Sequence, residues 1–212
     1  MIITNALSTL VLYHWHGTSY LLAAPNAKHM SSRRTNQSIR VIPQEPHLFS
    51  GSVRFNLDPF GECSDAACWQ ALRASRLGDF VSDSLPDGLS SHVSEGGTTW
   101  SAGQRQLLSI ARAILHRRRV VLLDEATASV DFESDQAIQE MLRSKEEGSA
   151  FKDATLIVIA HRIDTIIDSD QVLVMENGLL VEDGSPEVLL AKGEVDGIFA
   201  QMVAASRMRS SP

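Results

Sequence analysis

The feature that most constrains the fold is an uninterrupted apolar run, residues 120–123, that ends in two adjacent carboxylates, Asp124 and Glu125. A run of this length without a polar interruption is typical of a strand buried on both faces of a sheet. A helical pattern follows over residues 132–145, and a second apolar strand pattern covers residues 155–160. Strand, helix and strand in alternation predict an α/β fold with a right-handed crossover.

Composition and charge narrow the class of protein. The chain has 212 residues, 43% of them hydrophobic and 21% charged, which suits one globular domain or one domain with an inserted subdomain. Its net charge of −7 argues against nucleic acid as a partner, because binding phosphates needs a basic surface. Cys63 and Cys68 cannot make a disulfide scaffold or complete a four-ligand zinc site, and are expected to be half-buried hydrophobes. No stretch is long and apolar enough for direct membrane insertion.

Local patterns predict the remaining elements. The Ser185-Pro186 pair marks a helix start, and an Asn-Gly pair at residues 177–178 marks a hairpin turn. A loop over residues 94–103 is expected to open directly into a helix. The expected elements are strand 39–42, helices 65–77, 78–85 and 104–117, and hairpin strands 171–175 and 179–182.

The first 37 residues differ from the rest, because they show no sustained helical or strand period. We therefore expect an irregular segment there. His14 and His16 flank Trp15, but no carboxylate or cysteine lies nearby to complete a metal site.

Asp124 and Glu125 are the sharpest candidates for chemistry. Ligands of open α/β sheets bind at the carboxyl ends of strands, where this pair is expected. One carboxylate there can bind Mg²⁺ while its neighbour activates an attacking water. The pattern alone leaves open a second interpretation, in which the two acids cap a following helix.

A second candidate is the Ser-Ala-Gly-Gln sequence at residues 101–104. A glycine-rich loop that feeds a helix N-terminus offers free backbone N–H groups and the positive end of a dipole, which favour a phosphate. The tetrapeptide alone is weak evidence. Followed by Arg-Gln-Leu-Leu and Ala-Arg-Ala within residues 105–113, it becomes highly specific.

Five ordered motifs resemble those of the nucleotide-binding domains of ABC transporters. They are residues 41–46 (the Q-loop), 101–104 (the signature), 124–125 (the end of the Walker B strand), 128–131 and His161. Residues 44–60 resemble the second nucleotide-binding domain of the C subfamily, the multidrug-resistance-associated type. The resemblance runs from residue 38 to the C-terminus. It implies a partial ABC ATPase domain with a P-loop NTPase-like α/β fold, a helical subdomain at about 51–103, and an unmatched segment at 1–37.

The resemblance implies roles on the Mg²⁺ side of the site. Asp124 would hold Mg²⁺, and Gln44 would coordinate Mg²⁺ or the attacking water. Glu125 would be the catalytic base, and His161 would contact the γ-phosphate. Chemistry of this kind is mostly positioning and electrostatic stabilisation.

Other matching residues would serve an ATP bound mainly by an opposing domain. Ser101, Ala102, Gly103 and Gln104 would form the signature contact, and Asp131 would lie in the loop that crosses the dimer interface. The partners implied are a second nucleotide-binding domain, arranged head to tail, and the transmembrane domains of an exporter. The location implied is the cytoplasmic face of a membrane.

Three departures from the family pattern qualify these roles. Trp100 stands where the signature usually has Leu, and Ala102 where it has Gly or Val. No G-x-x-x-x-G-K-[ST] phosphate loop occurs anywhere in the chain. We therefore expect a fragment of an ATP-hydrolysing domain, with negligible turnover as an isolated chain. The alternatives are a non-hydrolysing partner that lends its signature loop to a complete domain, and a non-functional truncated product.

Overall fold

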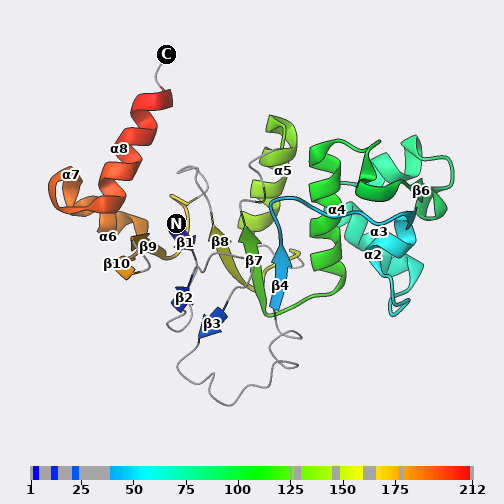
Figure 1. Ribbon diagram of the computed structural model, residues 1–212, viewed down its shortest axis with the longest axis horizontal. Helices are drawn as coiled ribbons and strands as arrows, with labels where there is room; N and C mark the ends of the chain where they lie inside the picture. The colour runs from blue at the N-terminus through cyan, green and yellow to red at the C-terminus, as the bar shows by residue number, and fades with distance from the viewer. Residues whose placement is uncertain are drawn as a thin grey trace. The chain divides into compact units, whose positions relative to one another are not determined.

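The computed structural model (Figure 1) describes residues 2–4, 11–13, 21–23, 39–124, 126, 130–144, 149–159, 166–176 and 179–210. The chain divides into two compact units. The central unit is Arg40–Ala154, and the terminal unit combines Met1–Ile39 with Thr155–Pro212. Each unit is described by itself.

The central unit contains most of the helices. Their bounds, with those of the strands, are β4 Ile39–Ile42, β5 Gly51–Ser52, α2 Val53–Leu57, α3 Asp65–Ala74, the π-helix η2 Phe80–Ser84, η3 Gly88–Ser90, β6 His92–Val93, η4 Glu95–Gly97, α4 Ala102–Leu115, β7 Val120–Asp124 and α5 Phe132–Arg143. β5 pairs with β6 in an antiparallel ribbon.

The two longer strands of this unit match the sequence predictions. β4 ends before Pro43, and β7 covers the apolar run and its first carboxylate. The two strands are hydrogen-bonded neighbours in one sheet. Val121, Leu122 and Leu123 are buried, as expected for a strand covered on both faces.

Helix α3 is shorter than the predicted 65–77, because a Schellman motif ends it at Ala74. Arg76 adopts a left-handed φ of 57°, and its N–H donates to the carbonyl of Arg73 at 3.0 Å. The N–H of Leu77 reaches back to the carbonyl of Leu72 at 2.9 Å. This pair of bonds satisfies carbonyls that the helix end would otherwise leave unpaired. The residue at the left-handed position is arginine rather than the usual glycine, so the pattern gave no stop signal.

Helix α4 was predicted over 104–117 and instead runs over Ala102–Leu115. It starts two residues earlier because Ser101 is its N-cap and Gln104 completes a capping box. It ends two residues earlier because His116 leaves the helical conformation, with φ −104° and ψ 61°. Helix α4 contacts α2, α3 and α5 and lies between α5 and the α2–α3 pair in Figure 1.

Helix α5 begins where the sequence predicts, with Asp131 as its N-cap. It ends at Arg143 rather than at residue 145, because Ser144 is extended, with φ −63° and ψ 116°. The buried side chains of α5 include Ala137 and Ile138, one turn into the helix from its capped end.

The terminal unit contains a three-stranded sheet of order β1-β9-β10 and three helices. β9 and β10 form the predicted antiparallel hairpin, although its Asn-Gly turn lies outside the described residues. Ser185 caps α6 as predicted, with Pro186 at the first helical position. The bounds are β1 Ile2–Thr4, β2 Val11–Tyr13, β3 Leu21–Ala23, β8 Thr155–Ile159, β9 Val172–Glu176, β10 Leu179–Gly184, α6 Pro186–Ala191, α7 Gly193–Asp196 and α8 Ile198–Ser210.

Three short strands lie in the first 37 residues, where an irregular segment is expected. β1 pairs with β9, and β2 pairs with β3, both antiparallel. The other residues of that segment lie outside the described part of the chain. The boundary at residue 37 stays a prediction.

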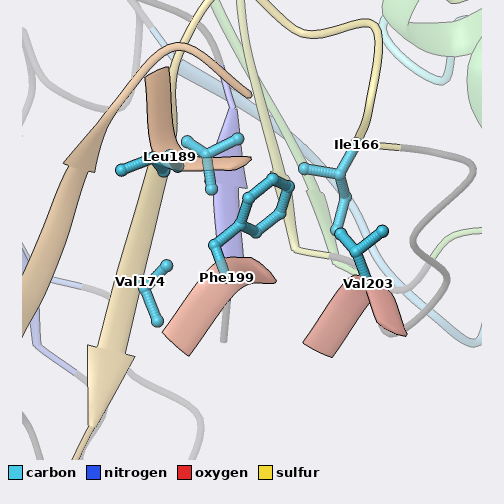
Figure 2. Close-up of a cluster of buried hydrophobic side chains, with 6 residues drawn as sticks. Ile166, Val174, Leu189, Phe199 and Val203 are labelled. Atoms are coloured by element: carbon cyan, nitrogen blue, oxygen red, sulfur yellow. The ribbon is translucent and has the colours of Figure 1, made fainter. Parts of the chain in front are cut away.

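Buried apolar side chains of the terminal unit form a cluster between its hairpin and its helices. Figure 2 shows the ring of Phe199, from α8, in the middle of this cluster. The buried carboxylate of Glu182 caps the start of α8 by accepting a hydrogen bond from the N–H of Phe199 at 2.8 Å. The cluster consists of Ile166, Val172, Val174, Leu189, Phe199 and Val203.

Among the described residues, no helix combines the length and the apolar character that crossing a membrane requires.

Candidate nucleotide site around helix α4

The start of α4 presents an exposed, fully formed helix cap. The Oγ of Ser101 accepts a hydrogen bond from the N–H of Gln104 at 3.0 Å, and the Oε1 of Gln104 accepts one from the N–H of Ser101 at 2.9 Å. A serine hydroxyl accepts and donates at once, so capping leaves the proton of Ser101 free to donate. The N–H groups of Ala102 and Gly103 belong to the first turn, which has no partner within the helix. This end of α4 can therefore donate several hydrogen bonds to an anion.

Trp100, the first departure from the family pattern, packs in the core of the central unit. Its side chain is buried and meets Phe80 edge to face, with ring centroids 5.2 Å apart and an interplanar angle of 79°. Such aromatic pairs add about 0.5–1.5 kcal/mol beyond the area that they bury. The guanidinium of Arg105 donates to the carbonyl of Trp100 at 2.5 Å and fixes the backbone just before the cap. The bulky residue thus anchors the signature turn without occupying its exposed face.

Gly103 brings the signature turn against the start of α5. It is buried, and a Cβ added there would lie 2.7 Å from Oδ2 of Asp131, 2.8 Å from Cβ of Ser134 and still closer to Oγ of Ser134. Real Cβ atoms do not approach other atoms so closely. Only glycine therefore allows these two helix starts to meet, which explains its place in the motif.

Asp131 stabilises the start of α5 and lies beside the signature turn. Its carboxylate accepts a hydrogen bond from the N–H of Ser134 at 3.0 Å. Hydrogen bonds from Ser134, backbone first, lower the pKa of the Asp131 carboxyl below its ordinary value. The group is therefore ionised at neutral pH, and Asp131 is exposed to solvent. The structure thus brings together the signature residues 101–104 and Asp131, which the sequence places 27 residues apart.

Gln44 is exposed and lies two residues after the end of β4. Two contacts fix the backbone on either side of it. The amide of Gln106, on α4, donates to the carbonyl of Pro43 at 3.2 Å. The N–H of Gly96 donates to the carbonyl of Leu48 at 2.9 Å. The segment that contains Gln44 is therefore held by α4 and by the loop that precedes it.

Arg112 is a residue that the sequence pattern did not single out as functional. Its Nε donates to the carbonyl of Asn56 at 2.6 Å, its Nη1 to the carbonyl of His47 at 2.7 Å, and its Nη2 to Oδ1 of Asn56 at 2.9 Å. Burial, aided by the charge of Arg40, lowers the pKa of Arg112 to about 10, so it stays charged at neutral pH. One side chain thus joins α4 to the segment after Gln44 and to α2.

Asp124 is half-buried at the end of β7, the position predicted for it. Its carboxylate and the side-chain oxygen of Gln44 are hard oxygen donors of the kind that Mg²⁺ prefers, and they follow neighbouring strands of one sheet. The residues present therefore fit a magnesium ion. Glu125 and His161 lie outside the described residues, so their positions relative to Asp124 stay predictions.

Known proteins resemble this chain in both sequence and fold. A family model described as ABC transporter matches residues 9–128, more than half of the chain, and this range starts inside the first 37 residues. A probable multidrug resistance-associated protein of Drosophila melanogaster is 50% identical over 188 residues, 89% of this chain and 13% of the relative. ATP-binding cassette sub-family C member 3 of Rattus norvegicus is 46% identical over 84% of this chain and 11% of its own length.

A solved structure agrees with this relation. A bacterial Atm1-family ABC exporter with ATP bound superposes with a TM-score of 0.75 at 29% identity, over 92% of this chain and 33% of the exporter chain. The chain thus spans about a tenth of the curated relatives and a third of the solved exporter. On these grounds the chain belongs to the ABC transporter family, as a nucleotide-binding-domain sequence of the C-subfamily, multidrug-resistance-associated type.

Proposed function

We propose that this chain is part of the ATP-hydrolysing, energy-coupling domain of an exporter, and that it presents the start of α4 to an ATP held by a second nucleotide-binding domain. The single observation that carries this proposal is the packing of Gly103 against Asp131 and Ser134 beneath an exposed Ser101.

Ser101 and the first turn of α4 would bind the γ-phosphate. The hydroxyl proton of Ser101 and the N–H groups of Ala102 and Gly103 can converge on one oxyanion, and the helix dipole adds a favourable field. Asp131, ionised beside this turn, would disfavour a second anion there and so help to place the phosphate at Ser101 alone.

The residues at the ends of the two neighbouring strands would serve a nucleotide on this domain's own side, not the ATP that Ser101 contacts. Asp124 and Gln44 would hold Mg²⁺, which neutralises the charge that develops on the phosphate oxygens. Glu125 would accept the proton of the attacking water, and His161 would donate to the γ-phosphate. These roles rest on the motif order in the sequence.

The wider setting follows from the relatives. We propose that the domain pairs head to tail with a second nucleotide-binding domain. It would work on transmembrane domains of an exporter, at the cytoplasmic face of a membrane. Gln44 would report the nucleotide state to those domains, because α4 holds the backbone around it through Gln106 and Arg112.

A complementation assay tests the proposal. A complete nucleotide-binding domain of a C-subfamily relative, with its own signature serine changed to alanine, is mixed with the full chain in Mg²⁺ and ATP. We expect turnover to rise at least about tenfold, since a lost oxyanion donor costs a factor of about 10²–10³. The chain with Ser101→Ala should give no such rise, whereas Ser64→Ala, which removes a cap from α3, should keep it. No stimulation by the unmodified chain, or equal stimulation by Ser101→Ala, would contradict the proposal.

A second candidate function is that of a non-hydrolysing partner, which lends its signature turn but has no active site of its own. The exposed, capped start of α4 would be enough for this role. A second partner separates the two, with an intact signature but its own catalytic base changed to glutamine, so that it cannot hydrolyse the ATP it holds. Turnover that Glu125→Gln abolishes supports a chain that contributes its own base, and no turnover supports the non-hydrolysing partner.

A further inference from the structure

Three potential metal ligands meet near the C-terminal end of α4, the end opposite to Ser101. Asp58 directly follows α2, Cys63 lies in the turn before α3, and His116 is the C-cap of α4. One ligand atom from each, a carboxylate oxygen, the Sγ and a ring nitrogen, lies within 4.8 Å of the other two. This group is called the α4 C-terminal cluster below.

The carboxylate of Asp58 is only partly satisfied by hydrogen bonds from the described residues. Its side chain is fully buried. Its Oδ2 accepts from the N–H of Cys63 at 2.7 Å and from Nη1 of Arg54 at 3.2 Å. Its Oδ1 is buried and has no hydrogen-bond partner among the described residues. An unsatisfied buried carboxylate oxygen is costly, so its presence needs an explanation.

The ring of His116 lies near that oxygen but too far away for a hydrogen bond. Nε2 of His116 lies 3.9 Å from Oδ1 of Asp58, beyond the range of a hydrogen bond. Two ligands of one tetrahedral ion, each about 2.0–2.3 Å from it, are about 3.3–3.7 Å apart. The spacing in the cluster therefore suits a bridging ion better than a direct bond, after inward movement of about 1 Å for its widest pair.

We propose that Asp58, Cys63 and His116 bind one zinc ion, with a fourth position open to water. A set of one sulfur, one nitrogen and one oxygen ligand suits Zn²⁺, whereas Mg²⁺ and Ca²⁺ are held by oxygen ligands. Cys63 and His116 are only partly buried, which leaves the ion a path from solvent. On binding, the thiol of Cys63 loses its proton to solvent, and its thiolate and the carboxylate together balance the charge of the ion.

The neighbouring arginine is compatible with this ion. Arg54 contacts Oδ2 of Asp58, the oxygen turned away from the orphaned one, and its Nε donates to Oδ1 of Asp65 at 2.8 Å. The carboxylate of Asp65 therefore also offsets the charge of Arg54. Arg54 acts as an outer support that orients Asp58, in the way that groups around metal ligands commonly do.

Zinc binding would restrain the position of α4. Zinc would tie the turn between α2 and α3 to the C-cap residue of α4, at the end opposite to Ser101. It would hold the signature helix against the helices beside it without touching the nucleotide.

Metal titration of the full chain tests the site. Zn²⁺ is added in competition with a chromophoric chelator, and Co²⁺ is used as a spectroscopic probe. We expect one Zn²⁺ per chain, no displacement by excess Mg²⁺, and a thiolate-to-cobalt charge-transfer band. Cys63→Ser should abolish the band, and Cys63→Ser and His116→Gln should each weaken Zn²⁺ binding at least tenfold, since losing even a supporting group costs about 10–100-fold.

Matched controls separate this site from other cysteines and histidines of the chain. Cys68→Ala, His92→Gln and the pair His14→Gln with His16→Gln should all bind Zn²⁺ as the unmodified chain does. Circular dichroism establishes that each variant is folded, and His116→Gln decides the matter if Cys63→Ser is not. Failure of the unmodified chain to bind Zn²⁺ would overturn the proposal. So would unchanged affinity in His116→Gln, or binding lost only in the His14 and His16 variant.

Discussion

The two ends of helix α4 are stabilised by different kinds of contact. At its start, Ser101 is exposed and its cap is made by hydrogen bonds between residues three apart in the sequence. Near its end, Arg112 is held by acceptors 56 and 65 residues away in the sequence. Local contacts leave the start of the helix available for a ligand, while long-range contacts fix the rest of it. A signature helix can thus present one end to a ligand because its other end is anchored.

The largest effect is expected at the anchored end, for Arg112→Met. The change keeps much of the apolar volume but removes three donated hydrogen bonds, to the carbonyls of Asn56 and His47 and to Oδ1 of Asn56. We expect the free energy of unfolding to fall by about 2–4 kcal/mol, at about 1 kcal/mol or more per bond. Urea denaturation of the full chain measures this loss. The exposed Arg117→Met is the matched control and should cost less than about 0.5 kcal/mol. Equal losses in the two variants would show that Arg112 is no anchor.

The next largest effect is expected beneath the presented end, for Gly103→Ala. Alanine normally stabilises a helix relative to glycine by about 1 kcal/mol. Here the added Cβ collides with Asp131 and Ser134, so we expect a net loss of about 1–3 kcal/mol in unfolding free energy. Combining it with Ser134→Gly should recover part of the loss. A stabilising Gly103→Ala would mean that α4 and α5 do not meet as described.

A smaller effect is expected at the exposed cap itself. Ser101→Ala should lower the free energy of unfolding by about 1 kcal/mol, and Ser101→Asp should keep most of the cap. Ser64→Ala at α3 should cost a similar amount, because Ser64 makes the equivalent bond to the N–H of Ala67. Thermal or urea denaturation of the three variants provides the comparison. A loss of unfolding free energy near zero for Ser101→Ala would show that Ser101 does not stabilise α4 as its N-cap.

The smallest effect is expected in the acid range, at Asp131. Its pKa is lower in the folded chain than in the unfolded one, so its stabilising contribution is present above its ordinary pKa of about 3.9 and is lost as the pH falls through the lower folded value. Asparagine caps helices as well as aspartate but does not titrate. Asp131→Asn should therefore show a flatter fall in unfolding free energy between neutral pH and about pH 3. Identical pH profiles would assign the acid loss to other carboxyl groups.

Much of the structure around the start of α4 could be predicted from the sequence, because interactions between residues close in the sequence determine it. The apolar run before Asp124 gave the strand, and Asp131 lies at the start of the helix predicted from residue 132. The sequence pattern predicts the start of α4 two residues late, because Ser101 belongs to a glycine-rich loop by composition but forms a capping box with Gln104. The stop of α3 was missed because an arginine takes the left-handed position usually given to glycine.

The anchored end could not be predicted in the same way. Arg112 lies on an apparently ordinary helix, and its partners are backbone carbonyls, which carry no sequence signal. Cys63 and His116 are 53 positions apart, and His116 precedes three arginines that the pattern attributes to a solvated helix end. Only the packing of α2 and α3 on α4 brings these groups together. Glu125 and His161 stay predictions from motif order.

The most direct test of the central claim is the affinity of the full chain for a complete nucleotide-binding domain, measured with and without ATP. A catalytically blocked partner keeps the nucleotide intact during the measurement. If the start of α4 binds an ATP held by its partner, association requires ATP and Mg²⁺, weakens at least about tenfold in Ser101→Ala, and is unchanged in Ser64→Ala. Association that ignores ATP, or that Ser101→Ala leaves as strong as before, would contradict the account.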